Sequence, residues 1–130
     1  MKKFIFIILI MFSTSLYAEW ELITKSEDNK AWVYLDTERI KKIDGFTYYW
    51  TLINYHNDEE AKNFETKSST SYHKADCKLF REKTLNLNFY KKLFGRGDVF
   101  ESIDTSRENW FYPPPVSISE YSLGFVCRND

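Results

Sequence analysis

The chain has only two cysteines, Cys77 and Cys127, about 50 residues apart. In an exported chain they should pair, because thiols persist mainly in reducing compartments. Closing a loop of about 50 residues removes denatured-state entropy worth roughly 4 kcal/mol in the simple loop model. A redox pair favours closer spacing and a metal site needs further Cys or His ligands nearby, and the sequence offers neither. We therefore predict a structural disulfide that fastens the C-terminal segment to the middle of the domain.

The first 18 residues have the three parts of a secretory signal peptide. Lys2 and Lys3 precede the apolar run Phe4–Phe12 and the more polar exit Ser13–Ala18, which favours cleavage after Ala18. A retained membrane anchor is the alternative, but a spanning helix needs roughly 20 apolar residues. We expect a signal peptide over 1–18 and one exported domain over 19–130.

The charge and composition of the expected domain limit its class. Loss of Lys2 and Lys3 changes the formal net charge from −1 to −3, so there is no global basic field for nucleic acid. The chain has 11 Phe, 9 Tyr and 4 Trp but only 4 Gly and 3 Pro, which favours strands. We predict a mainly β domain of the α+β class, with about six antiparallel strands and a short C-terminal helix.

Residue alternation and turn signals locate the strands. The clearest is Phe46–Tyr55, which follows Asp44-Gly45 and has apolar residues on both faces, so we expect it near the sheet centre. The other expected strands are Trp20–Thr24, Ala31–Leu35, Phe64–Cys77, a strand through Phe89, and Val99–Ile103.

Two of these strands carry further expectations. Phe64–Cys77 is rich in Ser, Thr and Lys, which suggests that one of its faces meets water. In the next strand, the odd positions are apolar except for Arg81 and Lys83, and this interruption marks either a bulge or an exposed end. The odd apolar positions are Cys77, Leu79, Leu85, Leu87 and Phe89.

The end of the chain has a different pattern. Three consecutive prolines end at Pro115 and separate the sheet from the C-terminal segment. Ser117 and Glu120 then form a capping-box pattern. Ile118, Tyr121 and Phe125 recur at helical spacing, and Leu123 and Val126 flank the same stripe. This pattern predicts a short amphipathic helix over Ser117–Cys127, laid on one sheet face and held by Cys127.

Several short motifs occur together in one order. They are Trp20-Glu21-Leu22, Val33-Tyr34-Leu35-Asp36, Tyr49-Trp50-Thr51-Leu52, Asp76-Cys77, Gly95-Arg96-Gly97, Trp110 followed by prolines, and Val126-Cys127. On these residues the chain resembles the bacterial surface-adhesin protein E family over nearly all of residues 19–130. The resemblance implies an antiparallel sheet with a C-terminal helix tied to it by the disulfide. It also implies export to the surface, the periplasm or the surroundings of a Gram-negative bacterium. It also implies a protein partner, because some relatives bind host matrix or plasma proteins such as vitronectin, laminin and plasminogen.

We expect a binding domain and no enzyme, since the sequence has no nucleophile-elbow, nucleotide-loop or zinc motif. His56 and His73 have no His or Cys at ligand spacing, so we expect exposed or hydrogen-bonded strand histidines and not metal ligands. Asp58-Glu59-Glu60 fits a solvated loop better than a calcium site. We therefore expect no catalytic residue, no cofactor and no metal ion. A periplasmic accessory or structural domain of an envelope complex is the alternative function.

Two groups of side chains have more than one interpretation. The segment 64–96 is locally basic, as a solvated face or, alternatively, as a patch for acidic partners. Its basic residues are Lys67, Lys74, Lys78, Arg81, Lys83, Lys91, Lys92 and Arg96. The aromatic residues Tyr48, Tyr49, Trp50 and Tyr55 fit core and cross-strand pairs better than a carbohydrate platform.

Overall fold

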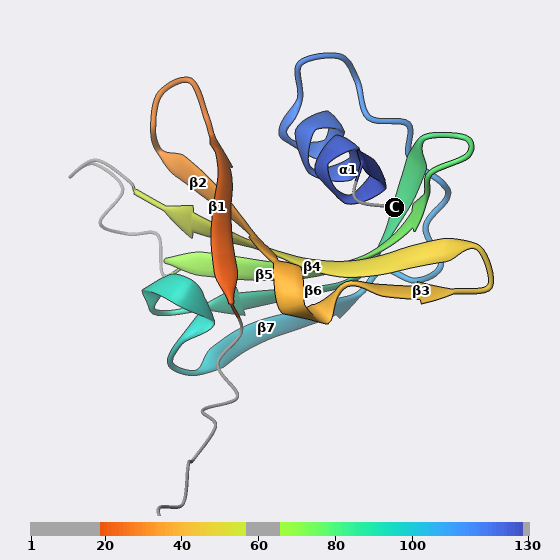
Figure 1. Cartoon of the computed structure of the whole chain (residues 1–130). Coiled ribbons are helices and arrows are strands. Elements are labelled where there is room, and N and C mark those ends of the chain that lie inside the picture. The colour runs from red at the N-terminus through yellow and green to blue at the C-terminus, as the bar shows by residue number, and fades with distance from the viewer. Residues whose placement is uncertain (1–18, 57–65, 129–130) are drawn as a thin grey trace, which may run out of the picture.

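The structure is a computed structural model, and it describes residues 19–56 and 66–128. In these residues the chain forms one antiparallel sheet of seven strands and one α-helix (Figure 1). The elements are β1 (Trp20–Lys25), β2 (Ala31–Asp36), η1 (Thr37–Arg39), β3 (Lys41–Ile43), β4 (Phe46–Tyr55), β5 (Ser68–Asp76), β6 (Arg81–Tyr90), η3 (Leu93–Gly95), β7 (Val99–Asp104) and α1 (Ile118–Arg128). The predicted signal peptide and the loop Asp58-Glu59-Glu60 lie outside the described residues.

The sheet follows the order of the chain. Its strands run β1-β2-β4-β5-β6-β7, and the short β3 pairs with β4 beside β2. The mainly β class, the antiparallel pairing and the central place of β4 are therefore confirmed. The sheet has seven strands where we expected about six, because the three residues of β3 are too few and too charged to show a strand pattern.

The hairpin before β4 forms as its sequence predicts. Asp44 and Gly45 have φ of +51° and +82°, the two positive values that a tight two-residue turn requires. Register then pairs Ile43 with Phe46 and Lys41 with Tyr48. The turn chemistry thus fixes which residues of β3 and β4 share a face.

Helix α1 lies on one side of the sheet (Figure 1), which we call the helix face. Leu35, Tyr49 and Ala75 are fully buried there against Leu123 and Val126 of the helix. Residues alternate between faces along β4, so Phe46, Tyr48 and Trp50 belong to the opposite side, which we call the open face.

The helix itself begins one residue later than predicted, and Ser117 caps it. The Ser117 hydroxyl accepts a hydrogen bond from the Glu120 backbone N–H at 3.0 Å, as expected of a capping residue. The predicted stripe is confirmed in part: Leu123 and Val126, expected on its flanks, face the sheet, whereas Tyr121 is 48 % exposed. Ser122 is also buried, which a pattern based on apolar residues does not show.

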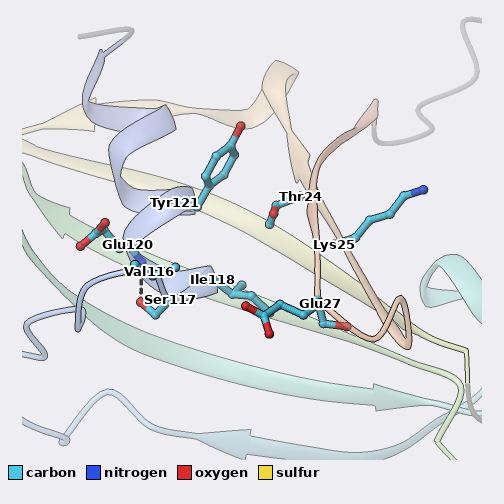
Figure 2. Close-up of a pocket in the computed structure, with 9 residues that line it drawn as sticks. Thr24, Lys25, Glu27, Val116, Ser117, Ile118, Glu120 and Tyr121 are labelled. Atoms are coloured by element: carbon cyan, nitrogen blue, oxygen red, sulfur yellow. Dashed lines mark hydrogen bonds between the residues drawn. The ribbon is translucent and has the colours of Figure 1, made fainter.

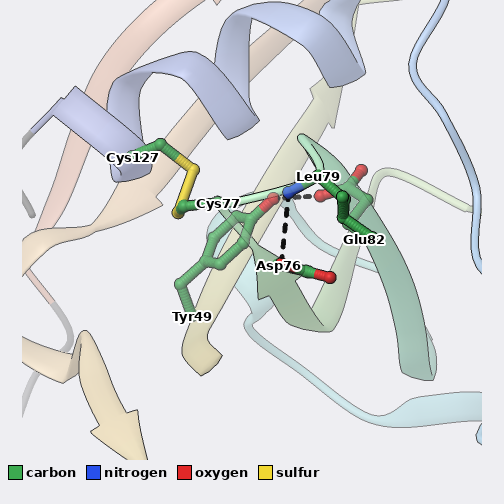
Figure 3. The surroundings of a disulfide bond; sticks show 6 residues. All are labelled: Tyr49, Asp76, Cys77, Leu79, Glu82 and Cys127. Atoms are coloured by element: carbon green, nitrogen blue, oxygen red, sulfur yellow. Dashed lines mark hydrogen bonds between the residues drawn. A yellow bond between two sulfur atoms is a disulfide. The ribbon is translucent and has the colours of Figure 1, made fainter. Parts of the chain in front are cut away.

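A disulfide joins Cys77 to Cys127, with Cα atoms 5.5 Å apart. Figure 3 shows Cys127 on α1 and Cys77 in the turn between β5 and β6, next to Tyr49. The predicted attachment of the helix to the sheet by the disulfide is confirmed. It places the end of α1 beside the β5–β6 turn.

Strand β5 differs from the expectation of a wet face. It lies between β4 and β6, and its small hydroxyl residues are buried, including Ser68 and Ser69. These two have partners: Ser68 Oγ accepts from the Gly95 backbone N–H at 2.9 Å, and Ser69 Oγ pairs with the Tyr55 hydroxyl at 2.9 Å. Buried hydroxyls with partners are compatible with a core, so polarity was a poor guide to exposure here.

A bulge in β6 explains the interrupted apolar pattern. Tyr72 pairs with Asn86 but its neighbour His73 pairs with Thr84, so Leu85 is the extra residue. Lys83, before the bulge, lies on the open face, whereas Leu87, after it, lies on the helix face. The prediction that Leu79 shares the face was wrong, since Leu79 lies in the turn before β6 and is 55 % exposed.

Candidate functional site: the open face of the sheet

One end of the open face is covered by the segment that contains η3. The Phe94 backbone N–H donates to Asn54 Oδ1 at 2.8 Å, and the Phe94 ring packs on Tyr34 with centroids 5.3 Å apart. A Cβ added at Gly95 would lie 3.4 Å from Thr70, and its φ is +62°, so glycine suits this close approach. The covered end leaves the other half of the face as the candidate site.

Half-buried aromatic side chains line that other half. Trp50 stacks on Tyr72, its direct neighbour on β5, with centroids 4.7 Å apart and planes 25° apart. Tyr48 lies 6.0 Å from Tyr72. The interpretation as cross-strand pairs therefore holds for Trp50 and Tyr48, while Tyr49 is a core residue on the other face. Rings that stay half-buried keep part of their surface available to a partner.

Beside these rings lies a second group, which we call the basic aromatic cluster and define as Phe46, Lys74, Arg81, Lys83 and Trp110. The Phe46 and Trp110 rings stack with centroids 5.7 Å apart. Lys74 Nζ is 4.2 Å from the Phe46 centroid, and Lys83 Nζ and the Arg81 guanidinium carbon are 5.1 and 4.4 Å from the Trp110 centroid. All three distances suit cation–π contacts.

Trp110 reaches this cluster through a backbone contact that sequence reasoning missed. The residue after it, Phe111, pairs with Glu82 in an isolated bridge of two backbone hydrogen bonds, with nitrogen–oxygen distances of 2.9 and 2.8 Å. This bridge holds the segment beside the first half of β6, beyond the part that pairs with β7. The composition of the proline-rich segment 110–115 did not indicate this bridge, because Glu82 and Phe111 lie far apart in the chain.

The charges of the cluster are only partly compensated. Arg81 Nε donates to Asp76 Oδ2 at 2.9 Å, and although partial burial acts in the opposite direction, this bond helps to hold the pKa of Asp76 below its ordinary value. Lys74 and Lys83 have no carboxylate within 4.0 Å among the residues that the structure describes. This end of the open face is therefore positively charged.

The helix face holds several buried polar side chains that hydrogen-bond to one another. The Tyr49 hydroxyl donates to Glu82 Oε2. Burial raises the pKa of both groups, and the Glu82 charge raises that of Tyr49 further. His73 lies between the hydroxyls of Thr51 and Thr84, at 2.8 and 3.2 Å, and burial lowers its pKa to about 4. His73 is thus a neutral, hydrogen-bonded residue of the interior.

Two of the hollows formed by described residues border α1. A cavity of about 170 Å³ lies between the helix and the sheet, next to His73 and Glu82. A more open cleft of about 360 Å³ separates the β1–β2 turn from the start of the helix, and Figure 2 shows Glu27 and Tyr121 on its two walls. Lys25, Glu27 and Glu120 give this cleft mixed charge, so it favours no one class of ligand.

The described residues include no group of three or more His, Cys, Asp and Glu placed to hold a metal ion. His56 packs against Trp32 with centroids 4.7 Å apart. In the same described ranges, none of the helices has both the length and the apolar character to cross a membrane.

The basic segment singled out in the sequence divides in space. Lys74, Arg81 and Lys83 gather on the open face around Trp110. Lys67, Lys78, Lys91 and Lys92 are exposed, outside this cluster, and Arg96 lies 5.9 Å from the Phe94 ring at the covered end. The exposed lysines fit the interpretation as a solvated face, and the patch for acidic partners stays a prediction for the three residues around Trp110.

Comparisons with known proteins agree on one architecture. The family model described as surface-adhesin protein E matches residues 20–128. A selenomethionine form of Haemophilus influenzae protein E aligns with a TM-score of 0.61 at 14 % identity, covering 89 % of this chain and 91 % of that chain. A second crystal form of that protein gives 0.61 at 15 % identity, with 89 % and 92 % covered. No curated protein sequence matches.

Proposed function

Since the chain belongs to the surface-adhesin protein E family, we propose that it is an exported, non-enzymatic domain that binds host extracellular-matrix or plasma proteins. The observation that carries the proposal is the asymmetry of the sheet. One face is closed by α1 and the disulfide. The other presents half-buried aromatic rings and two lysines, Lys74 and Lys83, that contact rings and have no described carboxylate within 4.0 Å.

The chemistry of the open face suits a protein partner. Interfaces are enriched in Trp, Tyr and Arg, and a few of these residues carry most of the binding free energy. Trp50 and Tyr72 supply rigid rings that lose little side-chain entropy on binding. The stacked pair is therefore the expected centre of the interface.

Binding of the oxidised chain 19–130 to immobilised vitronectin, laminin and plasminogen tests the proposal. We expect saturable binding that Trp50→Ala weakens by about tenfold or more. Tyr121→Ala is the matched control, because Tyr121 is an exposed ring on α1, away from the open face. Circular dichroism confirms that each variant is folded. A folded, disulfide-bonded chain that binds no component in a broad matrix and plasma screen would disprove the proposal.

Protease treatment of intact cells distinguishes a surface location from a periplasmic accessory role. We expect loss of this chain while a known periplasmic protein survives. Protection of both proteins would instead favour a domain that serves an envelope complex of the same bacterium.

A further inference from the structure

We infer that the basic aromatic cluster and the neighbouring Lys41 form a site for a sulfated polysaccharide chain. This inference deepens the proposed function and rests on it, because it names one kind of molecule in the host matrix that the open face would hold. Three features of the structure carry the inference: a row of lysines, the position of that row in the sheet, and the rings on each side of it.

Three lysines and one tyrosine form a single row across four strands. Register places Lys41 of β3 opposite Tyr48 of β4, Tyr48 opposite Lys74 of β5, and Lys74 opposite Lys83 of β6. All four side chains therefore share the open face. Neighbouring strands lie roughly 4.8 Å apart, so the row is on the order of 14 Å long. Its length and direction suit a linear polyanion that crosses the strands.

The pairing of Lys74 with Lys83 is unfavourable for an isolated protein. Like charges directly opposite each other on adjacent strands destabilise a sheet. No described carboxylate lies within 4.0 Å of either ammonium group. The nearby rings of Phe46 and Trp110 offset only part of the repulsion through cation–π contacts. An anionic ligand seated between the two lysines would remove the rest.

The place of the row in the sheet favours a saccharide over an acidic peptide. Extended peptides gain affinity through main-chain hydrogen bonds at a free sheet edge. Beneath Lys74 and Tyr48, however, strands β4 and β5 are paired on both sides. The backbone groups of these strands are already paired, so a ligand here is recognised by side chains alone. A saccharide can bind in this way because it needs no main-chain hydrogen bonds to a sheet edge.

Aromatic rings flank the row on both sides. Phe46 and Trp110 lie towards one end of the strands, and Trp50 and Tyr72 towards the other. The Phe46 and Trp110 rings already contact each other and the cations of the cluster, so they hold the lysines in place. The half-buried Trp50 and Tyr72 rings offer the surface for the apolar C–H face of a pyranose ring, while the lysines bind sulfate groups. The combination of rings and cations thus matches a polymer that is both anionic and built of sugars.

Titration calorimetry of heparin binding to the oxidised chain 19–130 tests the inference. We expect binding that weakens as salt rises, and a loss of about five- to tenfold in affinity for Lys74→Gln or Lys83→Gln, the size of one charge-assisted contact. Lys91→Gln is the matched control, because Lys91 is exposed outside the cluster and its loss should leave affinity unchanged. Removing either lysine of the opposed pair relieves repulsion, so both variants should fold.

Competitors and a second readout complete the test. Desulfated heparin should bind at least tenfold more weakly, and polyglutamate should fail to displace heparin. Equal displacement by polyglutamate, or equal affinity of Lys83→Gln and the unmodified chain, would overturn the inference. Binding to a matrix protein free of glycosaminoglycan, without any heparin binding, would overturn it and leave the proposed function standing. Heparin binding without any matrix or plasma protein partner would support it and count against the proposed function.

Discussion

His73 shows how a polar side chain becomes part of an interior. It is buried on the helix face, where the hydroxyls of Thr51 and Thr84 occupy its two ring nitrogens. Its sequence context predicted a hydrogen-bonded or exposed strand histidine, and the first of these is confirmed. The sequence could not name these partners, because Thr51 lies on the neighbouring strand β4 and the position of Thr84 depends on the bulge in β6.

This environment predicts a pH dependence of stability. The pKa of His73 is about 4 in the fold because burial disfavours its charged form, whereas an unfolded histidine titrates near 6.5. The unfolded state therefore binds more protons between these values. The contribution of His73 to the free energy of unfolding is therefore fully present above about pH 6.5. It is lost as the pH is lowered towards 4, and the loss is on the order of 3 kcal/mol.

Urea unfolding of the chain and of His73→Gln at pH 7.5 and 4.5, followed by tryptophan fluorescence, measures this contribution. The loss of stability on acidification should be clearly smaller in the variant. Glu82 acts in the opposite direction, since its raised pKa weakens the fold as pH rises, but it is common to both proteins and cancels. His56→Gln, at an exposed position, should keep the full dependence. Identical profiles for the chain and His73→Gln would contradict the assignment.

At the scale of elements, α1 depends on its attachment. Its 11 residues are too few to be stable alone in water, and Leu123 and Val126 give it a narrow apolar contact with the sheet. The disulfide closes a separation of 50 residues. The helix is thus held partly by packing and partly by a covalent bond.

Replacing both Cys77 and Cys127 with serine should reduce the free energy of unfolding by about 4 kcal/mol, the loop-entropy value for this separation. Urea denaturation gives the loss, and the ellipticity near 222 nm reports whether α1 frays first. The unmodified chain in strong reductant is the control and should match the double variant. A variant as stable as the oxidised chain would show that the helix needs only its apolar contacts.

Sequence patterns predicted elements well where one physical signal dominates. Strand β4 has the predicted bounds because alternation and the Asp44-Gly45 turn agree. Signals failed where a tertiary contact decides the outcome. The buried hydroxyls of β5 resemble a solvated strand until their partners are known. Trp110 of the candidate site could not be placed, because the bridge of Phe111 to Glu82 positions it.

For the whole molecule, the sheet should lose order from its margins inwards. Strands β4 and β5 pair over eight registered positions, whereas β3 contributes three residues. β7 is exposed along its full length and pairs on one side only. Local stability rises with burial and with pairing on both sides.

Amide hydrogen exchange measures this gradient. We expect the slowest exchange for amides of β4 and β5, such as those of Leu52 and Ser71, and exchange faster by at least tenfold for the β7 amides that face outwards. Mass spectrometry of peptic fragments resolves the strands. Uniform protection across the sheet would instead show a single cooperative unit that opens only by complete unfolding.

The strand order has a kinetic consequence. Apart from the short β3, each strand pairs with the one that precedes it in the chain, so the sheet can zip up in the order in which the residues emerge from a ribosome or a translocation channel. Short loops keep the entropy cost of each closure small. The exception is α1, which must wait for the last residues before it can cover a core built from Leu35 onwards. The final event is the meeting of Cys127 with Cys77, and an oxidant that acts earlier would find only one thiol in place.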